Sequence, residues 1–265
     1  MISLVLTVLI AGIALRILLR QHWTAVAAGE RGALQSSLRG GALYLVSEFR
    51  EIGGTPGDPD ILAFAPESLT YRAMRGAGFS CRRSTGLVSI SLASFTGYRS
   101  PQAGRDSLLL HLENGEATSA DDQWLRIPVL SVGNGSCAGT PALDIATVLD
   151  TASYPTRSFA TFAPLRTFEV MQVKLYQSAG EYWLGTRSVS AGETIQPVIG
   201  PLSSQGLALA YYDSTGAVAT AATDVRSIEI TIRGMTSVGV RSGAGFGSVN
   251  RQPDSLTTRV LLRNW

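Results

Sequence analysis

The chain of 265 residues is poor in several residue types that carry chemistry. It has two cysteines, two histidines and a single lysine, Lys174, among 22 basic residues. The cysteines and histidines are too scattered for a zinc site, and neither cysteine belongs to a C-x-x-C pair. No basic block carries interleaved aromatic residues, which argues against nucleic-acid binding. We therefore predict no metal, no cofactor and no nucleic-acid partner.

Proline is absent before Pro56, and charged residues are absent from Met1–Leu15. Nothing therefore breaks a continuous helix over the first fifty residues. A helix that is apolar on every side must be surrounded by lipid or by other proteins. We expect residues 1–24 to form the membrane or fibre-core half of a long helix. The residues expected to make its contacts are Leu4, Leu6, Leu9, Ile13 and Ile17.

Residues 25–52 continue this pattern with one important change. Apolar residues now recur at steps of three and four, which marks one face of a helix. We expect this amphipathic half to pack on a globular domain through Leu34, Leu38, Leu45, Phe49 and Ile52. Glycine lowers helix propensity by up to about 1 kcal/mol relative to alanine, so local melting is expected near Gly29–Gly32.

Residues 53–265 are rich in glycine, serine and threonine and contain short alternating segments. These features predict antiparallel strands, most clearly at Ile228–Ile232. Residues 133–141 hold three glycines and a proline and are expected to form a loop, whereas residues 140–163 give no clear pattern. The predicted class is α+β, with a long N-terminal helix packed on an antiparallel β-sheet domain.

Cys81 and Cys137 are the whole cysteine complement. In a chain with a membrane-type N-terminus, we predict that they form one disulfide outside the cytosol. Closing a loop of this length contributes roughly 4 kcal/mol in the chain-entropy model, as an upper estimate. Two unpaired buried thiols are the alternative.

The apolar run raises two difficulties for a membrane anchor. Met1–Leu15 spans roughly 22 Å as a helix, against a hydrocarbon core of about 30 Å, so the span must continue past Arg16. Arg16 and Arg20 also follow the run, where the positive-inside rule favours a cytoplasmic body and opposes the predicted disulfide. A natural start upstream of Met1, with a basic leader, would remove both difficulties. A signal peptide cleaved after Ala25-Val26-Ala27 is the alternative.

Two parts of the chain resemble one known family. The run Ile2–Leu9 resembles the start of the helix in type IV pilin-like proteins, which comprise minor pilins and type II secretion pseudopilins. The segment Gly206–Asp213, then Gly216 and the Ile228–Ile232 alternation, is similar to the C-terminal sheet of PilW-type minor pilins. Thr258–Asn264 is similar to their closing strand. The family's leader, cleavable glycine and glutamate are missing here, so the resemblance implies a start upstream.

The resemblance implies a structural protein without enzymatic activity, which initiates or caps a type IV pilus. Its partners would be the major pilin and other minor pilins through their N-terminal helices, the inner-membrane assembly platform and a tip adhesin. It would cross the bacterial inner membrane once, with a periplasmic body, and then reach the pilus at the cell surface. The alternatives are a J-type secretion pseudopilin and a membrane-anchored periplasmic binding module that never enters a fibre.

Three motifs with possible chemistry lack essential parts. Ser136 does not lie in a G-x-S-x-G elbow, and only two histidines could serve as its base. Gly243–Ser248 has neither the lysine nor the following helix of a phosphate-binding loop. Asp121-Asp122 lacks the ligand spacing of a calcium loop. We therefore predict no catalytic residue.

Overall fold

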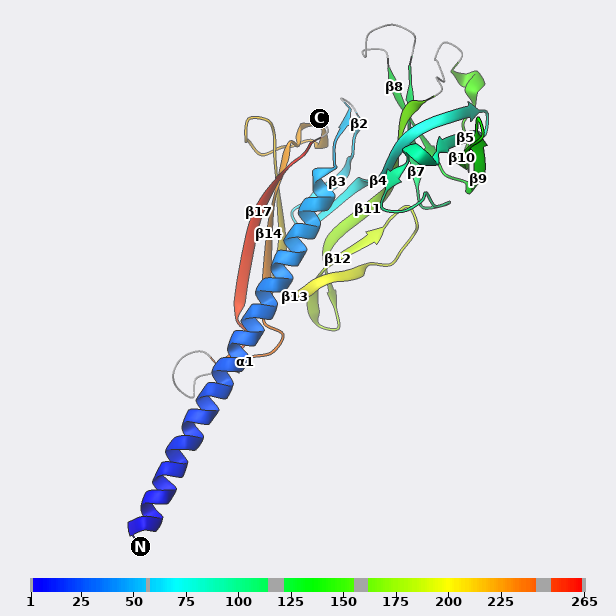
Figure 1. Cartoon of the computed structure of the whole chain (residues 1–265). Coiled ribbons are helices and arrows are strands. Elements are labelled where there is room, and N and C mark those ends of the chain that lie inside the picture. Colours follow the sequence, from blue (N-terminus) through cyan, green and yellow to red (C-terminus); the bar gives the residue numbers. More distant parts are fainter. Residues whose placement is uncertain (1, 56–57, 114–121, 155–161, 242–248, 264–265) are drawn as a thin grey trace.

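The computed structural model describes residues 2–55, 58–113, 122–154, 162–241 and 249–263, with the backbone alone at 2–5, 55 and 241. One helix, α1 (Ile2–Arg50), is 49 residues long. Its C-terminal half lies against a β-rich body, and its N-terminal half projects away from that body (Figure 1). The predicted α+β class, with a long N-terminal helix on an antiparallel sheet, is confirmed.

The body consists of antiparallel strands and three short 3-10 turns. The strands of its first half are β1 (Gly54–Thr55), β2 (Asp58–Pro59), β3 (Ile61–Ala65), β4 (Ser68–Ser84), β5 (Leu87–Ser91), β6 (Thr96–Gly97), β7 (Ser107–Leu112), β8 (Gln123–Pro128), β9 (Ser131–Cys137) and β10 (Thr140–Ala146). Those of its second half are β11 (Ala163–Ser178), β12 (Glu181–Ser188), β13 (Gln196–Tyr212), β14 (Ser227–Met235), β15 (Val240–Arg241), β16 (Val249–Asn250) and β17 (Pro253–Leu261). The turns are Leu92–Ser94, Thr151–Ser153 and Ala222–Asp224.

The largest sheet has the strand order β17-β14-β13-β12-β11-β4-β5-β10-β9, and β7 with β8 extends from β11. Strands β4 and β11 are its spine. They pair from Ser68 opposite Lys174 to Ser80 opposite Ala163, with one irregularity after Thr167. Because this pairing continues through the whole body, β11 contributes buried residues to both of its hydrophobic cores, whereas the buried apolar residues of β4 belong to the first.

The first core lies between α1 and the sheet. All five residues expected on the packing face are buried, with at most 8% exposure: Leu34, Leu38, Leu45, Phe49 and Ile52. The Phe49 ring meets the Tyr71 ring edge-on, with centroids 5.4 Å apart. The helix ends at Arg50, and the N–H of Ile52 donates to the Phe49 carbonyl at 3.1 Å.

Two glycines let the helix and the sheet approach closely. A Cβ added to Gly41 would lie 2.3 Å from Ile199 Cδ1, and one added to Gly234 would lie 2.6 Å from Leu34 Cδ1. Gly40, the neighbour of Gly41, has open space in the corresponding direction. The contact between α1 and β13 therefore depends on a missing side chain at Gly41.

Gly41→Ala should destabilise the fold, because the new methyl group meets Ile199 in a packed core. Overpacking of this kind costs about 1–3 kcal/mol. The matched control is Gly40→Ala, which should stabilise the helix by up to about 1 kcal/mol. Urea unfolding of the two variants, followed by circular dichroism, measures both effects. Equal changes in the two variants would contradict the close approach described here.

The second core lies in the part of the body farther from α1. It is formed by β5, β7, β8, β10 and the first half of β11, together with the segments that follow β8 and β10. Its buried residues are Val88, Ile90, Leu108, Leu110, Leu112, Ile127, Val129, Leu143, Ile145, Leu149 and Leu165. The body therefore folds around two cores that share β11.

The loop expected at residues 133–141 is wrong, because β9 and β10 form a hairpin there. Ala138 and Gly139 have φ values of 49° and 81° and make its turn. The other two glycines that suggested a loop, Gly133 and Gly135, belong to the edge strand β9. A Cβ at Gly135 would lie 2.2 Å from Asp144 Oδ1, so this glycine allows the Asp144 carboxylate to lie over β9.

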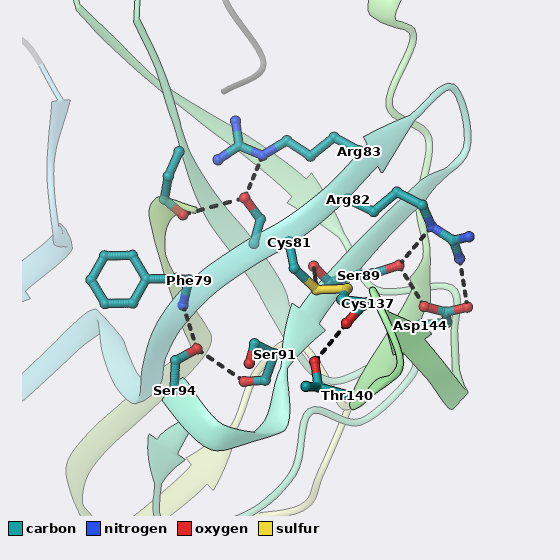
Figure 2. Close-up of a disulfide and its surroundings, with 12 residues drawn as sticks. Phe79, Cys81, Arg82, Arg83, Ser89, Ser91, Ser94, Cys137, Thr140 and Asp144 are labelled. Atoms are coloured by element: carbon teal, nitrogen blue, oxygen red, sulfur yellow. Dashed lines mark hydrogen bonds and ion pairs between the residues drawn. A yellow bond between two sulfur atoms is a disulfide. The ribbon is translucent and has the colours of Figure 1, made fainter. Parts of the chain in front are cut away.

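The predicted disulfide between Cys81 and Cys137 is present, with the two Cα atoms 5.9 Å apart (Figure 2). Beside it, the Ser89 hydroxyl donates to Asp144 Oδ1 at 2.5 Å, and Arg82 forms an ion pair with Asp144 Oδ2 at 3.0 Å. Strands β5 and β10 separate β4 from β9 in the sheet. The disulfide therefore fastens the tip of the β9–β10 hairpin back to β4.

Replacing both cysteines, as Cys81→Ala with Cys137→Ala, should loosen the second core and leave the helix packing intact. The stability loss should be at most about 4 kcal/mol, since the bond closes a 56-residue separation. Hydrogen exchange should show lost protection in β9 and β10 and unchanged protection in residues 34–49. Non-reducing peptide mapping of the native protein should show the cross-linked pair, and free thiols there would contradict the assignment.

Candidate functional site: the projecting helix and its supports

The N-terminal half of α1 exposes a continuous apolar surface. Its large apolar side chains between Leu6 and Trp23 are 40% to 64% exposed: Leu6, Val8, Leu9, Ile10, Ile13, Leu15, Ile17, Leu18, Leu19 and Trp23. Four of the five residues expected to make membrane or fibre contacts are in this set. The fifth, Leu4, lies in the helix, but only its backbone is described. Within the described part of the chain, α1 is long and apolar enough to cross a membrane.

The length of the projecting segment fits a bilayer. Ile2–Trp23 is helical throughout, and at about 1.5 Å per residue it extends about 33 Å, close to the hydrocarbon thickness of about 30 Å. Arg16 and Arg20 are exposed and form no ion pair with any described residue. Their long side chains can extend toward an interface while their methylene groups stay in an apolar layer.

Glu30 attaches the helix to the body at the point where the projecting half begins. Its carboxylate accepts hydrogen bonds from the Ser237 hydroxyl at 2.7 Å, the Ser237 N–H at 3.1 Å and the Val238 N–H at 3.4 Å. The hydroxyl contact is the main cause of a lowered pKa for Glu30. The helix is continuous through Gly29 and Gly32, so the melting expected there is not seen.

Glu48 attaches the other end of the packed half. Its carboxylate accepts from Arg75 at 3.1 Å and from the Tyr71 hydroxyl at 3.0 Å. Arg75 also binds Glu169, with Nε and Oε1 2.5 Å apart. The network extends through the ion-paired residues Arg99, Arg105, Asp106 and Glu193.

This network is costly to break, because several of its charges are buried. The side chain of Glu169 is 3% exposed and that of Arg75 is 11% exposed. Burial alone would raise the pKa of Glu169, but the hydrogen bonds from Arg75 and Arg105 lower it below its ordinary value. Removing one partner of a buried ion pair lowers the free energy of unfolding by about 3–5 kcal/mol, since the other charge stays buried and unpaired. The helix end is therefore fixed to the β4–β11 spine.

Glu30 and Glu48 were not predicted, although the helix spacing contains a signal for both. Glu30 precedes Leu34 by four residues, and Glu48 precedes Ile52 by four, so both carboxylates lie on the packing face. A carboxylate within an apolar face needs a partner on the opposing surface. Their partners could not be identified, because Ser237 and Arg75 lie far away along the chain.

The other sequence motifs do not form a site. Ser136 lies on the edge strand β9, and Gly243–Ser248 and Asp121 lie outside the described residues. Asp122 forms an ion pair with His111, with Oδ2 and Nε2 3.3 Å apart. Within the described ranges, no group of three or more metal-binding side chains comes together.

Comparison of the chain with protein-family models, with curated proteins and with solved structures finds no match. Functional conclusions therefore rest on the geometry of the projecting helix and its two supports.

Ile13→Asp should weaken membrane association of the full chain about 100-fold. A carboxylate near the centre of a spanning helix costs about 2.5–3.5 kcal/mol, and each 1.4 kcal/mol is tenfold. Flotation with phospholipid vesicles measures the membrane-bound fraction. Leu43→Asp is the matched control, because Leu43 is 70% exposed but lies on the packed half of α1. Unchanged flotation of the Ile13 variant, or equal losses in both, would contradict the assignment.

Proposed function

We propose that this chain is a structural subunit of a type IV pilin-like assembly, a minor pilin of the PilW type that initiates or caps a fibre. The observation that carries this proposal is the division of α1. The face from Leu34 to Phe49 is buried in the chain's own body, whereas the large apolar side chains from Leu6 to Trp23 are 40% to 64% exposed in the described structure. Lipid surrounds the projecting half before assembly, and the helices of neighbouring subunits surround it afterwards. Helix packing can replace lipid contacts at little net cost, because both surroundings are apolar.

The location proposed for the body is the periplasm, with α1 as a single crossing of the inner membrane. Arg16 and Arg20 alone would favour a cytoplasmic body under the positive-inside rule. The Cys81–Cys137 disulfide favours the opposite side, because the cytosol keeps such thiols reduced. We give the disulfide more weight, since it is a bond formed within the folded body. The proposed partners are other minor pilins, the major pilin, the membrane assembly platform and a tip adhesin.

A photo-cross-linking experiment tests the fibre role. The amino acid p-benzoylphenylalanine replaces Ile13 in the full chain, and surface fibres are sheared from cells after irradiation. We expect the chain in the fibre fraction, cross-linked to the N-terminal helix of another subunit. The same label in place of Leu130, which is 54% exposed and remote from α1, should give no helix cross-link.

Two results would overturn the fibre role. One is retention of the whole population in the membrane, with cross-links from position 13 to lipid alone. The other is recovery of the chain in fibres when the p-benzoylphenylalanine at position 13 forms no cross-link to another protein. Strict membrane retention would instead support a membrane-anchored binding module.

A further inference from the structure

Five strands lie side by side at the junction between the two cores, in the order β6, β4, β11, β7 and β8. One row of directly opposite residues crosses all five: Thr96, Ala77, Arg166, Leu109 and Arg126. Opposite residues of antiparallel strands project from the same face of a sheet. Arg166 is therefore at the centre of a five-stranded face, and Arg126 is at one end of the row.

Rings occupy the next row on the same face. Phe79 lies opposite Pro164, and His111 lies opposite Trp124, each two residues along its strand from the first row. The His111 and Trp124 rings meet at a tilted angle, with centroids 5.0 Å apart. Phe79 is 46% exposed. The opposite face of these strands covers the second core, so the face with the rings is the one open to solvent.

Three hollows lie over this face, and Arg166 lines all three. The smallest, of about 170 Å³, is also lined by Trp124 and Arg126. The other two measure about 410 Å³ each, and one is lined by Tyr98 and the other by Phe79. Together they form a groove centred on a guanidinium group and flanked by aromatic rings, which we call the Arg166 groove.

The groove contains one guanidinium group, that of Arg166, whose hydrogen-bond donors no described residue accepts. Arg166 forms no hydrogen bond and no ion pair with any described residue, although Asp60 and Glu51 border the groove. Arg126 pairs with Asp58, yet its Nε is buried without an acceptor.

The nearby carboxylates already have partners. Asp60 accepts from the Gly53 N–H at 3.1 Å and lies 3.5 Å from Arg72 NH1. Asp58 accepts from Arg72 at 3.2 Å in addition to its pair with Arg126. Free guanidinium donors in a fork geometry suit a carboxylate, which can accept two parallel hydrogen bonds.

The pairing of the strands decides between possible anionic ligands. At this row β4, β11 and β7 are each paired on both sides, so among the described strands only the outer edges of β6 and β8 are unpaired. A peptide therefore cannot add as an extra strand over Arg166, at the centre of the face, through main-chain hydrogen bonds. Recognition must come from ring faces and side-chain charge. An acidic sugar fits these demands, because its ring has an apolar C–H face and it carries a carboxylate.

We propose that the Arg166 groove binds an acidic saccharide. The carboxylate lies against the Arg166 guanidinium, beside the positive charge of Arg126, and the sugar ring lies against Trp124. Further sugar units extend toward Phe79 or Tyr98. This role is separate from the assembly role of α1, since the groove lies on the body and uses no residue of the projecting helix.

Titration calorimetry with the full chain in detergent tests the proposal. The probe is a tetramer of α-1,4-linked galacturonate, with a neutral galactose tetramer and a tetraglutamate peptide as comparisons. We expect binding of the acidic sugar alone, weakening with salt. Arg166→Gln and Trp124→Ala should each reduce its affinity at least tenfold. Arg39→Gln is the matched control, because Arg39 is exposed on α1 and forms no ion pair with any described residue.

Folding of the variants is checked by their thermal transitions, and Arg166→Lys provides a second variant that keeps the charge. It should bind more weakly than the native chain and more tightly than Arg166→Gln. Equal binding of neutral and acidic sugars would overturn the proposal, as would native affinity in a folded Arg166→Gln variant. Tighter binding of tetraglutamate than of the acidic sugar would also overturn it and would indicate a peptide ligand.

Discussion

The burial of one helix face against a sheet is the constraint on which this molecule depends. From Leu34 to Ile52, α1 supplies a face that must be covered, and the strands around Tyr71 and β14 cover it. Burial of this kind is the main favourable term in folding. It also leaves the N-terminal half of the same helix uncovered. One rigid element therefore belongs partly to the body and partly to whatever surrounds the projecting half.

Polar contacts determine the direction of that element. Hydrophobic burial is non-directional, so it holds the helix on the sheet without defining its angle. Glu30 and Glu48 bind the body at opposite ends of the packed half, through a loop and through the β4–β11 spine respectively. Two polar attachments about 27 Å apart along a helix define its axis closely, at about 1.5 Å per residue. The projecting half therefore leaves the body in a defined direction.

Much of this architecture follows from local patterns. The absence of proline before Pro56 and the spacing of Leu34, Leu38 and Leu45 predicted the helix and its buried face. The disulfide followed from the presence of only two cysteines in a chain with a membrane-type N-terminus. The alternation at Ile228–Ile232 likewise predicted β14. The helix face and the strand alternation are each visible within a short window of sequence, whereas the disulfide followed from the composition of the whole chain.

Features that depend on distant pairing were not predicted. The β9–β10 hairpin was mistaken for a loop, because only Gly139 belongs to its turn, whereas Gly133 and Gly135 lie within β9 and Gly135 makes room for Asp144. The two cores were not separated, since the sharing of β11 between them is a matter of strand order. Arg166 was not singled out, because its position at the centre of a face depends on the register of five strands. Local propensity carries no information on such registers.

The fit between Gly41 and Ile199 has a mechanical consequence. The Ile199 side chain occupies a notch in the helix surface that only glycine leaves open. If α1 slid along its axis by one turn, Leu38 or Leu45 would take the place of Gly41. That leucine side chain and the Ile199 side chain could not occupy the same space. The fit therefore acts as a mechanical stop. A load applied to the projecting end meets a steric obstacle in addition to the hydrophobic contacts, which resist sliding only weakly.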